Sequence, residues 1–295
     1  MIKKLKQKVK RLRDFVLKGE RFFDNFNNAS VQVVLKNQYK MMKTMNPSRL
    51  PQLSEVGFSA YSQFEEDGIL LYIFSIIGEG RKRVVEICAG NGMECMATNL
   101  IINHGWEGLL FDGSEGNVRI GQEFFIKNKA TFLYPTRFCQ NWITIENVNE
   151  LIRSNGFSGE VDLLSLDIDG NDYWILKAIE VISPRVIICE TNNVIPSELA
   201  LTIPYDAEFN WQNSPKEKQD FVGVSLLAME KLCKSKGYRL IGAHKYGFNV
   251  IFMKNGKGEE YFPEVSIETV HNNPYTIEAR KNRWLAIKDL GWKKV

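Results

Sequence analysis

The most informative segment of the chain reads Val84-Val85-Glu86-Ile87-Cys88-Ala89-Gly90-Asn91-Gly92. Its apolar residues predict a buried strand with an acid near its end, and the glycines predict a tight turn before a helix. At the C-terminal edge of a parallel sheet, such a turn lets a ligand approach the backbone and exposes amide donors at the next helix. The segment therefore predicts a ligand site that includes Glu86, Gly90 and Gly92.

The flanking sequence alternates between short apolar runs and longer amphipathic stretches. Consecutive apolar residues in the short runs predict parallel strands that helices cover on both faces. We expect strands at residues 83–88, 108–112, 131–134, 161–167 and 185–190, with helices at 95–104, 115–129, 145–155 and 172–179. A helix at 226–236 and a hairpin of 238–243 with 249–254 follow. This order predicts an α/β, Rossmann-like fold with a seven-stranded, mostly parallel sheet and a C-terminal antiparallel hairpin, as in class I methyltransferases.

Composition excludes several classes of protein. The 295 residues are 44% hydrophobic and 12% aromatic, which suffices for a substantial core and excludes a disordered chain. The longest apolar run, from Ile69 to Ile77, is shorter than the roughly 20 residues that span a bilayer. The five cysteines are odd in number and none are spaced C-x-x-C, which argues against disulfides and zinc and predicts a reducing, cytoplasmic location.

Charge is distributed unevenly along the chain. Residues 1–50 hold 13 Lys and Arg against three acids, a balance of +10; since the whole chain carries +3, the remainder carries −7. Ile2, Leu5, Val9, Leu12 and Val16 recur every three or four residues, which predicts a basic amphipathic helix. Three roles are open for this helix: it docks on its own domain, it joins an oligomer, or it contacts an anionic membrane at the inner face through residues 1–26. Nucleic acid is not expected as a partner. We expect a helical arm over 1–50, a catalytic domain over 51–256 and a C-terminal extension over 257–295 that packs on the domain.

Further residues indicate which cofactor binds. Asp112 ends the second strand 22 residues after Gly90, close to the ~20 expected for a carboxylate that accepts ribose hydroxyls. The third glycine of a G-x-G-x-x-G motif would fall on Cys95, which favours S-adenosylmethionine over a cofactor with a pyrophosphate. The alternative is that the glycines only form a turn and that Asp112 caps a helix. Gln63 is a candidate for the methionine end of the cofactor, and Phe138 is a candidate for the adenine or for the core.

Four segments resemble FkbM-type and related bacterial S-adenosylmethionine-dependent methyltransferases, many of which act on sugars or secondary metabolites. They are YSQFEEDG (61–68), EICAGNGMEC (86–95), LSLDIDGNDYW (164–174) and GFNVIF (247–252), and the resemblance covers about residues 55–255. It implies a Rossmann-like fold with Glu86, Gly90, Gly92 and Asp112 around the cofactor. Cys88 departs from the motif, which commonly has glycine there; a thiol that points into the sheet is one way to accommodate it.

Acidic and amide residues follow the fourth and fifth strands. They are Asp167, Asp169, Asp172, Glu190, Asn192 and Asn193. Parallel strands bring these oxygens to one sheet edge, where they suit Mg²⁺, and the pattern resembles catechol-type and sugar O-methyltransferases. We expect Asp167, Glu190 and Asn192 as metal ligands, with Asp167 also beside the cofactor. The alternative is a turn and helix cap built from the same acids.

Catalysis and acceptor binding have their own candidates. Asp169 and His244 are candidates for catalysis, His244 as a general base at the hairpin turn unless it is merely exposed. The irregular stretch 191–221 supplies Tyr205, Asp206 and Trp211, which suit a sugar ring unless the stretch contacts no ligand.

The sequence predicts an S-adenosylmethionine-dependent O-methyltransferase that acts on a hydroxylated small molecule, such as a nucleotide sugar or a surface-glycan sugar. One alternative is a metal-dependent glycosyltransferase, because Asp167-Ile168-Asp169 matches the D-x-D pattern. The other is a non-catalytic scaffold with the methyltransferase fold.

Overall fold

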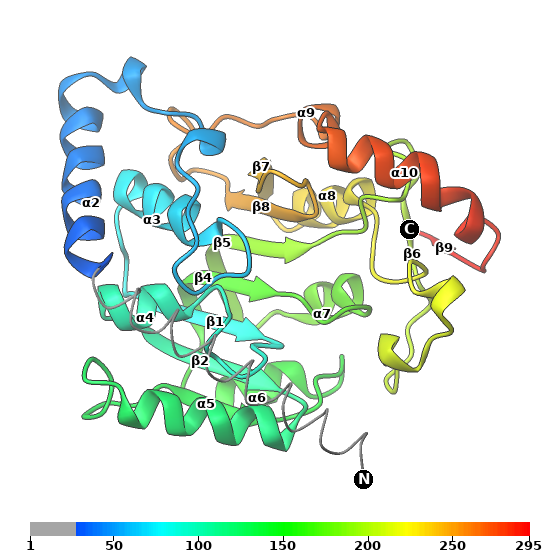
Figure 1. Ribbon diagram of the computed structural model, residues 1–295, viewed down its shortest axis with the longest axis horizontal. Coiled ribbons are helices and arrows are strands. Elements are labelled where there is room, and N and C mark those ends of the chain that lie inside the picture. The colour runs from blue at the N-terminus through cyan, green and yellow to red at the C-terminus, as the bar shows by residue number, and fades with distance from the viewer. Residues whose placement is uncertain (1–27) are drawn as a thin grey trace, which may run out of the picture.

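A central seven-stranded sheet organises the computed structural model, which describes residues 28–295 (Figure 1). The helix expected over residues 2–16 lies outside the described residues. The strands lie in the order β3 (Arg137–Gln140), β2 (Glu107–Asp112), β1 (Arg83–Ile87), β4 (Gly159–Leu166), β5 (Ile182–Glu190), β8 (Asn249–Lys254) and β7 (Tyr238–Ala243). Strands β1 to β5 pair in parallel, and β8 pairs antiparallel with both β5 and β7. The predicted Rossmann-like fold with a C-terminal antiparallel pair is therefore confirmed.

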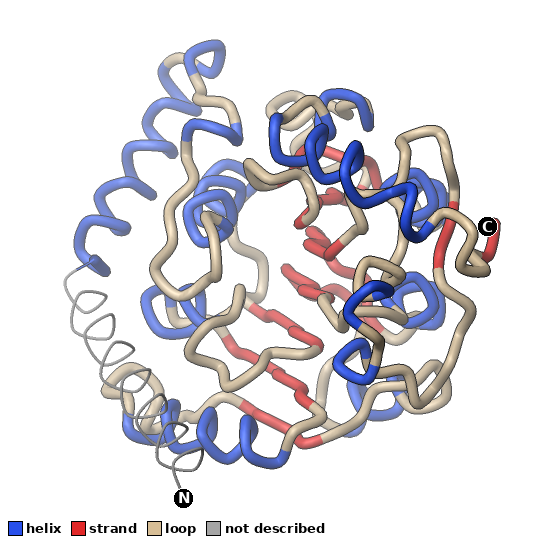
Figure 2. Tube along the Cα trace, turned by 45° about the vertical axis from the view of Figure 1, so that its right-hand side comes forward, coloured by secondary structure: helices blue, strands red, loops and turns tan. Residues whose placement is uncertain are grey.

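Helices cover both faces of the sheet, as Figure 2 shows. One face carries α2 (Asn28–Met45), α3 (Glu66–Ile77), α4 (Thr98–His104) and α5 (Glu115–Lys127). The other carries α6 (Val148–Ser154), α7 (Asp172–Ala178), α8 (Leu226–Ser235) and α9 (Ile267–His271). Within β1, Val84 belongs to the first core and Val85 to the second, and both are fully buried. The consecutive apolar residues of the strands are explained by this burial on both sides.

The remaining elements are short or lie toward the C-terminus. They are the 3₁₀ helices η1 (Pro47–Arg49), η2 (Leu53–Glu55), η3 (Trp211–Asn213) and η4 (Lys216–Lys218), the helix α10 (Pro274–Ile287), and the strand pair β6 (Leu201–Thr202) with β9 (Lys293–Lys294). The pairing of β6 with β9 ties the end of the chain to the irregular stretch after β5. Between residues 28 and 295, no helix has both the length and the apolar character that crossing a membrane requires.

The third strand was wrongly predicted. Residues 131–134 form turns, and Leu133 is 83% exposed, whereas β3 lies at Arg137–Gln140. The strand is at the sheet edge and pairs only with β2, so Phe138 is its one fully buried residue. An edge strand needs few apolar residues, and the more apolar run just before it gave a misleading signal.

A buried ion pair joins the starts of three strands to α3. The Arg185 guanidinium lies 2.8 Å from the Asp162 carboxylate, and both side chains are almost completely buried. Asp162 also accepts hydrogen bonds from the backbone amides of Gly80 and Arg83. Arg185 donates to the carbonyl of Gly78, just after α3. The pair therefore fixes the chain reversal between α3 and β1.

We expect Asp162→Ala to lower the free energy of unfolding by about 3–5 kcal/mol, because it leaves a buried guanidinium without its carboxylate. Chemical denaturation measures the change. Glu150→Ala is the control: it breaks an exposed pair with Arg153 and should cost at most about 1 kcal/mol. Similar losses in the two variants would contradict the role assigned to Asp162.

Candidate active site at the carboxyl edge of the sheet

The loop after β1 forms the first part of the site. Cys88, Gly90 and Gly92 all have positive φ angles, of 69°, 56° and 70°. A Cβ added to Gly90 would meet no atom within 4 Å, so the space beside it is open. A Cβ on Gly92 would lie 3.0 Å from both Phe125 and Phe138. The loop is therefore held against the core on one side and is accessible at Gly90.

Glu86 anchors this loop to the helix that follows. Its buried carboxylate accepts hydrogen bonds from the backbone amides of Met96 and Ala97, at 3.0 and 2.7 Å, immediately before α4. Burial raises the pKa of Glu86, while these two bonds oppose the rise. Both carboxylate oxygens are thus engaged in holding the loop.

Strand register sets four side chains in one row. Ile87 pairs with Phe111 on one side and with Leu166 on the other, and Leu166 pairs with Cys189. The residues one step beyond form the row, in the order Asp112, Cys88, Asp167 and Glu190. Neighbouring strands lie about 4.8 Å apart, so the side chains at the ends of β2 and β1 and those at the ends of β4 and β5 meet along this edge.

The two carboxylate oxygens of Asp112 differ in their hydrogen bonds. Its Oδ1 accepts hydrogen bonds from the Ser114 amide and the Asn117 side chain, at 2.8 and 3.1 Å. Its Oδ2 lies 4.0 Å from the Cys88 sulfur. The thiol of Cys88 is exposed beside this carboxylate and does not point into the sheet, because the positive φ turns it outward.

The other cofactor candidates lie at different depths. Phe138 is buried in the core against Gly92 and Gly121, so its ring supports the loop from behind. Gln63 is exposed in a loop that crosses the sheet edge: Tyr61 contacts Phe124 of α5, and Phe64 contacts His244 after β7. The loop thus passes from α5 to the antiparallel pair of β7 and β8.

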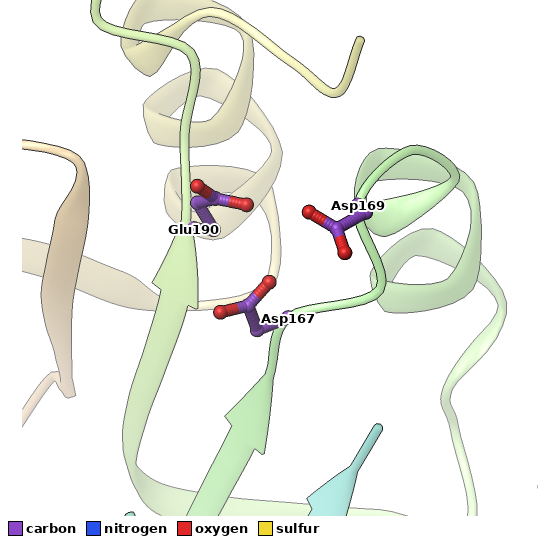
Figure 3. A group of neighbouring side chains, drawn as sticks. All are labelled: Asp167, Asp169 and Glu190. Atoms are coloured by element: carbon purple, nitrogen blue, oxygen red, sulfur yellow. The ribbon is translucent and has the colours of Figure 1, made fainter. Parts of the chain in front are cut away.

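Three carboxylates converge beyond β4 and β5 (Figure 3). Asp167, Asp169 and Glu190 each offer one oxygen, and these atoms lie within 4.8 Å of one another. Asp169 has a φ of 53°, in the left-handed region that non-glycine residues seldom adopt. Such spacing of three oxygen ligands suits a hard divalent cation.

Neighbouring polar groups have structural tasks. Asp172 accepts hydrogen bonds from the amides of Ile168 and Gly170, both at 3.0 Å, and so closes the turn before α7. The Asn192 side chain donates to the carbonyls of Asp220 and Val222, and its oxygen accepts from the amide of Val194. Asn192 therefore borders the carboxylates with its polar atoms already bonded to the backbone.

A cavity of about 170 Å³ opens beside the carboxylates. Its walls include Asp169, Glu190 and Asn192, and also three residues that the sequence did not single out: Asp220, Tyr275 and Arg283. Tyr275 and Arg283 come from α10, and Arg283 lies 2.9 Å from Asp220 in an ion pair. Nothing in the local sequence marks these residues, because only the folding of the C-terminal segment brings them to the sheet edge.

The irregular stretch after β5 covers the acidic turn. Trp211 forms a side-chain hydrogen bond with Asp169 that lowers the pKa of this acid against the larger effect of burial. Tyr205 instead donates to Glu146 at 3.0 Å and accepts from the amide of Ile145. Asp206 is exposed and accepts from the amide of Glu208. Of the three acceptor candidates, Trp211 alone contacts the carboxylate cluster.

His244 lies at the same sheet edge but outside the acidic cavity. The ring is buried against Phe64 and Phe248, and its Nδ1 accepts a hydrogen bond from the amide of Asn249. Burial lowers the pKa of His244 to about 4, so the ring is neutral at physiological pH. It borders a separate cavity of about 550 Å³ next to β7, away from the carboxylates.

Comparisons with known proteins give low identity throughout. No family model matches the sequence, and no curated protein matches it. The N-terminal domain of EvdMO1 with SAH bound is 13% identical, over 58% of this chain and 74% of that one, with a TM-score of 0.39. A S-adenosylmethionine-dependent methyltransferase from Clostridium acetobutylicum is 9% identical, over 63% and 89%, with a TM-score of 0.38. Magnesium protoporphyrin IX methyltransferase from Synechocystis is 12% identical, over 58% and 69%, with a TM-score of 0.34. At these scores the likenesses do not define the activity.

Protons partly relieve the repulsion among the clustered carboxylates. Burial, together with Asp172 and Asp169, raises the pKa of Asp167 to about 7. Burial and the neighbouring Asp167 raise the pKa of Glu190 well above its usual range. The two acids share a side-chain hydrogen bond in which Glu190 is the donor and Asp167 the acceptor.

This cluster predicts the sign of a pH effect on stability. The raised pKa lets the folded protein hold a proton on Asp167 up to about pH 7, whereas the unfolded chain releases it near pH 3.8. The stabilising contribution is thus complete below about pH 4 and is lost as the pH rises through about 7. In buffers with EDTA, we expect the melting temperature to fall between about pH 4 and 7, and to fall less in Asp167→Asn. Asp289→Asn, an exposed acid, should follow the wild type. Equal slopes for wild type and Asp167→Asn would contradict the assignment.

Proposed function

We propose that the chain is an S-adenosylmethionine-dependent O-methyltransferase whose acceptor is a hydroxylated small molecule. The observation that carries this proposal is the row of Asp112, Cys88, Asp167 and Glu190 across adjacent strand ends. It sets a ribose-type binding group beside the glycine loop and an acidic cavity two strands away. Binding of cofactor and acceptor to neighbouring parts of one edge is the arrangement that group transfer requires.

The residues present fit the cofactor. A ribose needs an acceptor for its hydroxyls, and the Oδ2 atom of Asp112 is the more open of its two oxygens. The space beside Gly90 allows a ligand to approach the backbone. Cys88 stands where the FkbM-type motif commonly has glycine, and its exposed thiol lies 4.0 Å from the Oδ2 atom of Asp112.

When bound, S-adenosylmethionine would supply an electrophilic methyl group for an oxygen of the acceptor. The protein's main task would be to hold the acceptor beside the cofactor in a reactive orientation. The acceptor hydroxyl must also lose a proton. Asp169 lines the cavity, and we assign it this proton. His244 is less suited to that role, since burial lowers its pKa to about 4, which makes it a weak base, and since it borders a different cavity.

The carboxylate cluster also fits a divalent cation such as Mg²⁺. We assign Asp167, Asp169 and Glu190 as its ligands, with Asp169 in place of the expected Asn192, whose oxygen is bonded to Val194. When bound, the ion would lower the pKa of an acceptor hydroxyl. Its charge would also offset the repulsion that raises the pKa of Asp167.

The sugar nature of the acceptor is supported by the resemblance to FkbM-type enzymes, and the acidic and amide-rich cavity supports a polyhydroxy ligand. Mass-spectrometric screening of hydroxylated metabolites for a gain of one CH₂ would identify it. The D-x-D alternative keeps one supporting observation, because both of its aspartates belong to the carboxylate cluster.

We expect Asp112→Ala to weaken binding of S-adenosylhomocysteine by about 10- to 100-fold, through loss of hydrogen bonds to a charged group. Titration calorimetry measures the affinity. Glu123→Ala, which removes an exposed acid of α5, should bind like the wild type. Wild-type binding to UDP- or GDP-sugars alone would favour the glycosyltransferase, and binding to neither ligand class would favour the scaffold.

We expect Mg²⁺ to raise the melting temperature of the wild type near pH 8, because the ion binds the folded cluster and not the unfolded chain. The increase should shrink near pH 6, where protons compete for Asp167. Asp167→Asn should show no increase at either pH. A wild type that responds neither to Mg²⁺ nor to EDTA would eliminate the metal site.

A further inference from the structure

Helix α2 has an apolar stripe on the face that points away from the protein. Its inner face packs through Gln32, Leu35 and Tyr39, the first and last of which are buried. Its outer face exposes four apolar side chains at spacings of three, seven and four residues, which place them on one side of the helix: Val31, Val34, Met41 and Met45. Val34 is 65% exposed and Met45 is 78% exposed. Apolar side chains on the solvent face of an 18-residue helix indicate an interaction surface.

The stripe continues into a shallow groove. The groove has a volume of about 570 Å³ and is lined by Val34, Met41, Met42 and Met45, together with Asn37, Gln38, Asn46 and Arg49. Flexible methionine side chains make such a surface adaptable to irregular apolar partners.

The charge around the stripe is of one sign. Residues 28–50 contain Lys36, Lys40, Lys43 and Arg49, and no Asp or Glu. Lys36 is paired with Glu79, whereas Lys40 on α2 and Arg49 in η1 are both exposed, and Arg49 lines the groove. The preceding 27 residues add nine basic and three acidic side chains. The partner of this surface should therefore be negatively charged.

The helix lies far from the carboxyl edge of the sheet. Gln32 bonds to His104, and Lys36 bonds to Glu79, residues that come shortly before β2 and β1 begin. Figure 1 shows α2 on the side of the molecule from which β4 and β5 point away. A partner on the outer face of α2 would thus leave the acidic cavity open to solvent.

We propose that the outer face of α2 docks the protein on an anionic lipid bilayer. Val31, Val34, Met41 and Met45 enter the interfacial layer, while Lys40 and Arg49 face the phosphate headgroups. A second copy of the chain suits this surface less well, because pairing two α2 helices would bring together two segments that carry basic residues and no acidic ones. The contact is peripheral, and the acceptor cavity then faces the aqueous side.

Flotation of the full-length protein with vesicles of phosphatidylcholine and phosphatidylglycerol tests this proposal. We expect binding that disappears with pure phosphatidylcholine and weakens as salt screens the charges. Val34→Glu combined with Met41→Glu should lower the partition coefficient at least about tenfold, because it places two acids in the interface. Lys40→Glu combined with Arg49→Glu should have a similar effect while leaving the apolar stripe intact.

Ile126→Glu combined with Leu285→Glu is the matched control, since these exposed apolar residues lie on α5 and α10. This control should bind like the wild type, and circular dichroism should show that every variant is folded. Undiminished vesicle binding by both α2 variants would overturn the proposal. So would a dimer, detected by light scattering, that the Val34→Glu and Met41→Glu changes dissociate without any vesicle binding by the wild type.

Discussion

The parallel register of β2, β1, β4 and β5 is the constraint on which the site depends. Because Ile87 is level with Phe111 and with Leu166, and Leu166 is level with Cys189, the residues one step further along each strand must be neighbours. Hydrogen bonding between strands fixes this row, since a slip by one residue would turn every side chain to the opposite face of the sheet and disrupt the packing of both cores. Asp112, Asp167 and Glu190 are therefore held together by the burial of residues that have no part in chemistry.

Holding acids together in this way has an electrostatic cost. Burial and mutual repulsion raise the pKa values of both Asp167 and Glu190, and the proton that Glu190 donates to Asp167 offsets part of the repulsion. Asp172 is spared a ligand role because two backbone amides bind its carboxylate. The remaining acids have oxygens directed toward one another and a cavity beside them. A cation or a polyhydroxy ligand at this position would replace protons as the source of relief, which links binding there to pH.

The two ends of the parallel strands carry different surfaces. The carboxyl edge carries the loop of Gly90, the carboxylates and the walls supplied by α10. The opposite side carries α2, whose contacts with Glu79 and His104 attach it where the strands begin. A basic, apolar surface at that side and an acidic cavity at the other give the protein a polarity of charge that follows the direction of its parallel strands.

The sequence alone determined the sheet, the glycine loop and the acids that end the strands, because continuous apolar runs, glycines and chain order carry local signals. It misplaced β3, since an edge strand with one buried residue is weakly marked, and it did not reveal that the Cys88 thiol lies beside Asp112. Only the tertiary structure decided that two backbone amides bind the Glu86 carboxylate and that His244 is buried in an aromatic cluster. It also brought Tyr275 and Arg283 to the cavity. These outcomes depend on which distant segments share a hydrogen bond or a volume, and no local pattern of residues encodes that.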